Sequence, residues 1–143
     1  MRWAFALVVC ILTLAACTNT ADTTTTIQNQ TPESVNTAWI EALKTNNRQA
    51  ALLLVGDLGG KEQQTLFVDQ MLRRMSGMLD PSLPPGGLVS IQEFTPVPDG
   101  QDMLGKSLWT FAKTKRCYES RMTPQQNEWK VINWGERAVC PNT

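Results

Sequence analysis

The residues of this chain that could carry chemistry are few, and its cysteines come first among them. The sequence contains Cys10, Cys17, Cys117 and Cys140, a single tyrosine, Tyr118, and no histidine. Without histidine the chain lacks the commonest general base, the imidazole metal ligand and the serine-histidine-aspartate triad. The chemistry to consider is therefore that of thiols, one phenol and isolated carboxylates.

Cys17 closes an apolar run at the N-terminus. Arg2 is the only charged side chain before Asp22, and residues 3–16 are almost all apolar or small. A basic tip, a short apolar stretch and small residues before a cleavage point are typical of a secretory signal peptide. The run is shorter than the roughly 18 apolar residues of a membrane-spanning helix. The alternatives are a buried N-terminal helix and an ordinary signal peptide that contains a cysteine by chance.

The end of the run, Leu14-Ala15-Ala16-Cys17, resembles the lipobox of bacterial lipoproteins. The resemblance implies that the Cys17 thiol receives a diacylglyceryl group, that the signal peptide is cut before it, and that Cys17 becomes the first mature residue. Two or more acyl chains, such as palmitate, anchor a protein stably in a membrane. We therefore expect the domain to lie on the extracytoplasmic side of a bacterial cell envelope. Thr18, where lipoproteins retained at the inner membrane carry Asp, implies the outer membrane if the cell has two.

The sequence divides into three parts: a signal peptide at 1–16, the lipidated Cys17 with a flexible tether at 17–30, and one domain at 31–143. The tether is rich in Thr, Asn and Gln and has too little apolar surface to offset the entropy of ordering. Flexible-coil scaling gives it a reach of about 20 Å. An edge strand formed by its threonine run is the alternative.

The charge of the mature chain is close to neutral. Removal of Arg2 with the signal leaves 12 Lys and Arg against 13 Asp and Glu. The chain has no strongly basic region, so we expect no nucleic-acid partner. About 110 residues suit a single domain with one modest core.

Cys117 and Cys140 are the two cysteines of the mature domain. An exported protein leaves the reducing cytosol, so an even pair is normally oxidised. We expect a disulfide between them, with two free thiols or a bond to another protein as alternatives. A hairpin turn near 123–127 would place Cys117 opposite Asn133, so we expect the chain to double back after Gly135 to bring Cys140 within reach.

The pattern of apolar residues predicts helices followed by strands. Helices are expected from Thr31-Pro32 to about Asn46, at 48–55 and at 61–79, and the Pro and Gly residues of 81–87 exclude helix after that. Strands are expected from Leu88 to Pro96, as one long stretch over 104–122, and at 129–134 after a turn at 122–128. In the last strand we expect Trp129 and Val131 to face one way and Ile132 and Trp134 the other. This order predicts an α+β domain with an antiparallel sheet.

Two segments, TPESVNTAWIEALKTNNRQAALLLV and NEWKVINW, resemble the small secreted members of the nuclear-transport-factor-like, cystatin-like superfamily. The resemblance covers residues 32–135 and rests largely on core patterning. It implies N-terminal helices packed on a curved sheet, forming a cone with a cavity. Many such members are lipoproteins of unknown function.

Several residues could line a cavity of this kind. Met71, Met75 and Met78 form an adaptable apolar row on the third helix, and Trp109, Tyr118 and Trp129 lie on predicted strands. The candidate ligand pocket comprises Met71, Met75, Trp109, Tyr118 and Trp129, although each of these residues also suits a plain core.

Catalytic residues are not evident in the sequence. Tyr118 with Asp69 could form an isomerase-like site, but a strand tyrosine with a half-buried ring and a solvated acid explain both residues better. Lys113, Lys115 and Arg116 form a basic cluster that reads as a solvated strand face, with binding of an anionic partner as the alternative. We expect no catalytic residue, metal or cofactor, and a binding protein rather than an enzyme.

These observations predict a membrane-anchored extracytoplasmic lipoprotein whose domain binds a small apolar ligand or an envelope protein without catalysis. A cone-type isomerase or hydrolase, and a structural envelope lipoprotein, are the alternatives. These three functions differ in what they require of the interior of the cone. An open cavity with inward polar groups favours an enzyme, an open apolar cavity favours ligand binding, and a filled interior favours an interaction or structural role.

Overall fold

The computed structural model describes residues 30–140, so the predicted signal peptide, Cys17 and almost all of the tether lie outside the described residues. The helices are α1 (Pro32–Lys44), α2 (Arg48–Leu54) and α3 (Lys61–Leu79). The strands that follow are β1 (Leu88–Glu93), β2 (Val97–Asp99), β3 (Asp102–Phe111), β4 (Lys115–Gln125) and β5 (Glu128–Arg137). Within these residues, no helix has both the length and the apolar character needed to cross a membrane.

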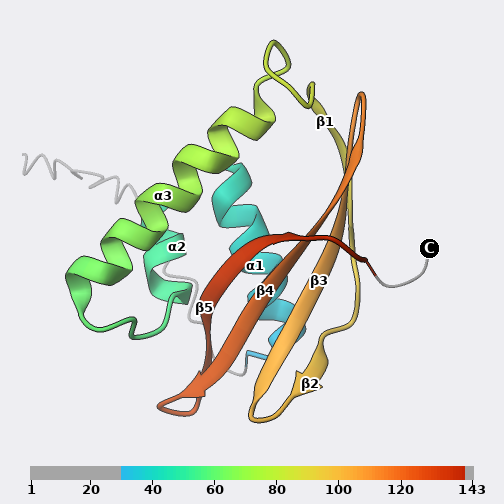
Figure 1. Ribbon diagram of the computed structural model, residues 1–143. Coiled ribbons are helices and arrows are strands. Elements are labelled where there is room, and N and C mark those ends of the chain that lie inside the picture. The colour runs from blue at the N-terminus through green and yellow to red at the C-terminus, as the bar shows by residue number, and fades with distance from the viewer. Residues whose placement is uncertain (1–29, 141–143) are drawn as a thin grey trace, which may run out of the picture.

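The strands form one antiparallel sheet with β3 near its centre. The hydrogen-bonded order is β1, β3, β4 and β5, and the short β2 also pairs with β3. The helices cover one face of the sheet, hereafter the inner face, and leave the opposite, outer face uncovered by helix (Figure 1). Helices on one side of a curved antiparallel sheet confirm the predicted α+β architecture.

The core lies between the helices and the inner face. It is built from residues of both layers, among them Val35, Trp39 and Leu43 of α1, Val68 and Met75 of α3, and Trp109, Tyr118, Met122 and Val131 of the sheet. These side chains are at most 1% exposed. Their burial supplies most of the free energy that holds the two layers together.

The helix boundaries follow the local signals in the sequence. The Thr31 side chain accepts a hydrogen bond from the Ser34 backbone N–H and caps α1, and Pro32 occupies the first turn, where its missing N–H costs nothing. The bounds of α3 are those predicted, while α2 ends one residue earlier, at Leu54. Val55 instead forms a parallel bridge with Val131 at the edge of β5, which ties α2 to the sheet.

The extended stretch predicted over 104–122 is wrong, because it is two strands with a turn between them. β3 ends at Phe111 and β4 begins at Lys115, with Thr110 paired to Lys115. The Phe111 N–H donates to the Thr114 carbonyl across the turn. The sequence did not indicate this turn because residues 112–114 contain neither Gly nor Pro, the residues that usually mark a turn.

The turn predicted over 122–128 is also wrong in extent. β4 continues to Gln125, and only Gln126 and Asn127, both with positive φ, connect it to β5. Paired left-handed residues form the tight hairpin turn that matches the twist of the strands. Pro124 is tolerated in β4 because it lies beyond the end of β3, where β4 has a neighbour on one side only.

The prediction of which β5 residues face the same side is wrong, because the strand contains a β-bulge. Arg121 pairs with Asn133 and Met122 pairs with Val131, so Ile132 is an extra residue in β5. An extra residue shifts the alternation by one position. Val131 and Trp134, which were expected on opposite faces, are therefore both buried in the same core.

Candidate functional site

The interior expected to hold a cavity contains a packed aromatic cluster. The Tyr118 and Trp134 rings stack with centroids 4.8 Å apart, and Trp109 lies 5.0 Å from Tyr118 and 5.8 Å from Trp134. All three side chains are almost completely buried. Offset stacked and tilted rings at these separations are favourable contacts. The aromatic residues on the inner face thus fill space that a ligand would need.

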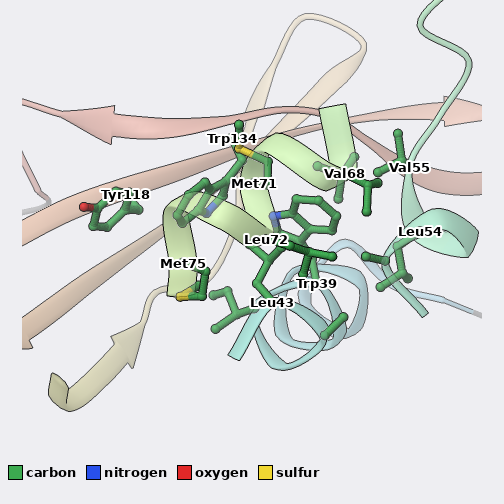
Figure 2. Packing of buried hydrophobic residues seen from close by; sticks show 14 of the residues in the cluster. Trp39, Leu43, Leu54, Val55, Val68, Met71, Leu72, Met75, Tyr118 and Trp134 are labelled. Carbon is green, nitrogen blue, oxygen red and sulfur yellow. The ribbon is translucent and has the colours of Figure 1, made fainter. Parts of the chain in front are cut away.

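The five residues predicted to form a pocket do not all come together. Met71 and Met75 are buried on α3, and Figure 2 shows them beside Trp134 and Tyr118 of the sheet. Trp129 is half-buried beside Pro124 at the tip of the β4–β5 hairpin, whereas Trp109 pairs with Arg116 near the opposite end of β4. Eight residues along a strand span roughly 26 Å. Trp129 therefore belongs to a different part of the inner face, and the ligand pocket stays a prediction.

Tyr118 and Asp69 each bond to a different residue. The Tyr118 hydroxyl donates to the Met78 sulfur, 3.0 Å away, and burial raises the pKa of the phenol. Asp69 accepts from the Arg48 guanidinium at 2.7 Å, and this bond lowers the pKa of the carboxyl. Tyr118 and Asp69 therefore have different hydrogen-bond partners, and no described contact joins them in one site.

The three residues of the predicted basic cluster lie in different surroundings. Lys113 and Lys115 are exposed near the β3–β4 turn, whereas Arg116 is half-buried and lies 3.4 Å from Glu136 of β5. Arg74 of α3 approaches the same Glu136 at 3.7 Å, and its guanidinium lies 5.8 Å from the centroids of the Tyr118 and Trp134 rings. These contacts close the end of the aromatic cluster with a cation over its ring faces.

A disulfide joins Cys117 and Cys140, as the sequence predicted, with their Cα atoms 5.3 Å apart. The predicted path of the chain is wrong. Because the turn lies at Gln126–Asn127 and β5 contains the extra residue Ile132, Cys117 pairs with Arg137 rather than with Asn133, and Cys140 follows three residues later. Gly135 is an ordinary strand residue paired with Glu119, so no doubling back occurs there.

The disulfide holds the C-terminal segment, residues 138–140, against the outer face. The Cys140 sulfur lies 3.7 Å from the Ser107 carbonyl oxygen of β3. Cys117 belongs to β4, so the segment that follows β5 passes the neighbouring strand to reach β3. Residues 138–140 therefore lie over the outer face, which no helix covers (Figure 1).

A cleft of about 410 Å³ lies beside residues 138–140, and we call it the outer-face cleft. Its floor is formed by Leu104 and Lys106 of β3, and one side by Val139 and Cys140. The other side is formed by Phe94 and Thr95 of the β1–β2 connection and by Val97 of β2. Two further clefts, of about 370 and 290 Å³, lie beside α1. None of these three clefts is lined by the five predicted pocket residues.

Sequence reasoning missed the outer-face cleft. Its lining comes from three separate segments, and only the pairing of Val97 with Leu104 and the disulfide bring them together. The one available signal was Cys140, because its bond to Cys117 requires the chain end to reach the sheet. Within the described part of the chain, no group of three or more His, Cys, Asp or Glu side chains is arranged to hold a metal ion.

No protein-family model and no curated protein matches the sequence. The structure is similar to a crystal structure of a Campylobacter jejuni protein that is named an NTF2-like transpeptidase, with a TM-score of 0.55 and 14% sequence identity. The match covers 73% of this chain and 99% of that chain. At this identity the similarity establishes the fold alone. The domain therefore has an NTF2-like (nuclear-transport-factor-like) fold, the fold that its sequence resembles.

Proposed function

We propose that the chain is an exported lipoprotein that displays an NTF2-like binding domain on the outside of a bacterial membrane. Cys17 carries the lipid, the segment to residue 30 spaces the domain from the membrane, and the domain binds a ligand or an envelope protein without catalysing a reaction. The outer membrane is its location if the cell has two membranes. The LAAC sequence at 14–17 supports the anchor.

The filled interior is the observation that carries the binding role. Trp109, Tyr118 and Trp134 occupy space between the sheet and α3, the region in which the sequence led us to expect a cavity. The three clefts described above open on the outside of the domain. Recognition of a partner is thus expected on the outer surface.

The anchor is tested by labelling cells with an alkyne analogue of palmitate and separating membrane from soluble fractions. The wild-type protein should be labelled and sediment with membranes. Cys17→Ser should remove the label and leave the protein soluble or uncleaved. Cys10→Ser is the matched control, because Cys10 is discarded with the signal peptide, and it should behave as wild type. Equal labelling of wild type and Cys17→Ser would overturn the proposal.

A further inference from the structure

The outer-face cleft combines an apolar lining with one cation. The side chains of Phe94, Val97, Leu104 and Val139 supply apolar surface, and Val97 and Val139 are 48% and 71% exposed. Lys106, on the floor, is the only charged side chain among the lining residues. An apolar cleft with a single placed polar group is the usual form of a small-molecule site, and about 410 Å³ falls within the usual size range of roughly 300 to 1,000 Å³.

The Lys106 ammonium forms no ion pair with any described residue, although carboxylates are close by. Glu119, its direct neighbour in the register of β3 and β4, accepts a hydrogen bond from Arg137 at 3.0 Å. Asp102, four residues earlier in β3, is held by Arg121 at 2.8 Å. The acid beside Lys106 and the acid further along β3 are thus both engaged by arginines, and the Lys106 charge is left for an external anion.

The floor of the cleft favours a small molecule over an extended peptide. β3 is hydrogen-bonded on both sides, to β4 on one and to β1 and β2 on the other. Its backbone therefore offers no free edge for an added peptide strand, which is the usual way in which a sheet binds a peptide. On the floor of the cleft, side chains rather than β3 backbone groups are therefore presented to a ligand.

We propose that the outer-face cleft binds a monocarboxylate with an apolar chain, such as a medium-chain fatty acid. The carboxylate bonds to the Lys106 ammonium, and the chain lies over Leu104 and Val97 against Val139. The charge-assisted bond supplies orientation, and each buried methylene adds affinity. This inference rests on the proposed function, since it names the ligand class of a domain that binds on its outside.

Decanoate is the probe, titrated by calorimetry into the cleaved, soluble form of the Cys17→Ser protein, which carries neither the lipid nor the apolar signal peptide and needs no detergent. Decanoate should bind more tightly than hexanoate, because the longer chain covers more of the cleft. Lys106→Met keeps the length of the side chain and removes its charge, so it should weaken decanoate binding about tenfold. Binding of decanol, which has no charge, should change less than twofold in the same variant.

Lys113→Met is the matched control, because Lys113 is exposed outside the cleft and its loss should leave decanoate affinity within twofold of wild type. A circular-dichroism melt of each variant confirms that the fold is kept. The proposal is overturned if decanoate does not bind at millimolar concentration, if decanol binds as tightly as decanoate, or if Lys106→Met binds decanoate like wild type. Such a result, with membrane labelling still lost in Cys17→Ser, would reject the ligand and leave the anchoring proposal intact.

Discussion

At the scale of the residue, Gly105 sets how closely α1 approaches the sheet. A Cβ atom at this position would lie 2.6 Å from the Asn36 side-chain oxygen and 3.2 Å from the Met122 methyl group. Asn36 has little freedom to move, because it is 1% exposed and its amide donates to Glu93 at 2.9 Å. The absence of a side chain on β3 therefore makes room for a polar contact between α1 and β1.

Gly105→Ala should lower the free energy of unfolding by about 1 to 3 kcal/mol, the usual cost of overpacking a core. Urea denaturation followed by tryptophan fluorescence measures the change. Gly77→Ala is the control, since a Cβ there meets no atom within 4 Å. Gly77 lies inside α3, so alanine should stabilise the protein by about 0.5 to 1 kcal/mol. Equal stability of Gly105→Ala and wild type would contradict the tight contact.

The carboxyl of Asp102 illustrates how one side chain makes stability depend on pH. The hydrogen bond from Arg121 lowers the pKa of Asp102 below its usual value of about 3.9. A folded-state pKa below the unfolded value means that the stabilisation is fully present above about pH 4 and is lost as the pH falls through the folded-state pKa.

Asp102→Asn should therefore destabilise the protein at pH 7 and have a smaller effect at pH 2.5, where the wild-type carboxyl is largely protonated in the unfolded state. Chemical denaturation of both proteins at the two pH values measures this difference. A gap between wild type and variant that is as wide at pH 2.5 as at pH 7 would show that the charge of Asp102 does not stabilise the fold.

At the scale of the element, the β4–β5 hairpin determines where the C-terminal segment lies. Its two-residue turn and the bulge at Ile132 together place Arg137 opposite Cys117, and the disulfide then fixes Cys140 beside β3. A wider turn would have put a different residue opposite Cys117. The outer-face cleft thus depends on strand register as much as on its own side chains.

Replacing both Cys117 and Cys140 with Ser should lower the free energy of unfolding by about 3 kcal/mol. The two cysteines are separated by 23 residues, and the chain-entropy model gives about this value for a loop of that size. Hydrogen exchange should also increase at residues 138–140, because little else holds this segment. Dithiothreitol should destabilise wild type and leave the double variant unchanged. A double variant as stable as oxidised wild type would show that the bond contributes nothing.

At the scale of the whole molecule, side chains pack the space between the helices and the sheet, and no helix covers the outer face of the sheet. The rings of Trp109, Tyr118 and Trp134 pack together between the sheet and α3. Figure 2 shows Met71 and Met75 of α3 in the same core. A filled interior was the outcome expected for an interaction or structural role. The protein therefore has an NTF2-like fold, and aromatic and methionine side chains pack between its helices and its sheet.

Tyr118→Phe and Asp69→Asn should each restore the phenotype of a deletion strain as fully as wild type. The Tyr118 hydroxyl is occupied by Met78 and Asp69 by Arg48, so neither group is placed for proton transfer. Complementation is measured with the protein level and thermal midpoint of each variant checked. Cys17→Ser is the control expected to fail, because the domain would leave the membrane. Loss of complementation by either of the first two variants, at normal level and fold, would favour an enzyme.

Local chemistry in the sequence was enough to predict the helices, the fold class and the cysteine pair. Thr31 and Pro32 start α1 through interactions with their own neighbours, and the Pro and Gly residues of 81–87 stop α3. The pairing of Cys117 with Cys140 followed from counting thiols in a chain that we expected to be exported. Each of these inferences needs only residues that are close in sequence, or a count.

Tertiary structure alone decided the register of the sheet, the packing of the interior and the position of the outer-face cleft. The turn at Gln126–Asn127 sets which residues of β4 and β5 pair with each other. The extra residue Ile132 then reverses the facing of the residues that follow it, so Trp134 lies on the inner face. Whether large side chains fill a cavity depends on which of them meet across strands and helices distant in sequence. Hydrophobic burial is non-directional, so a list of apolar residues predicts a core but not which space inside or outside it stays open.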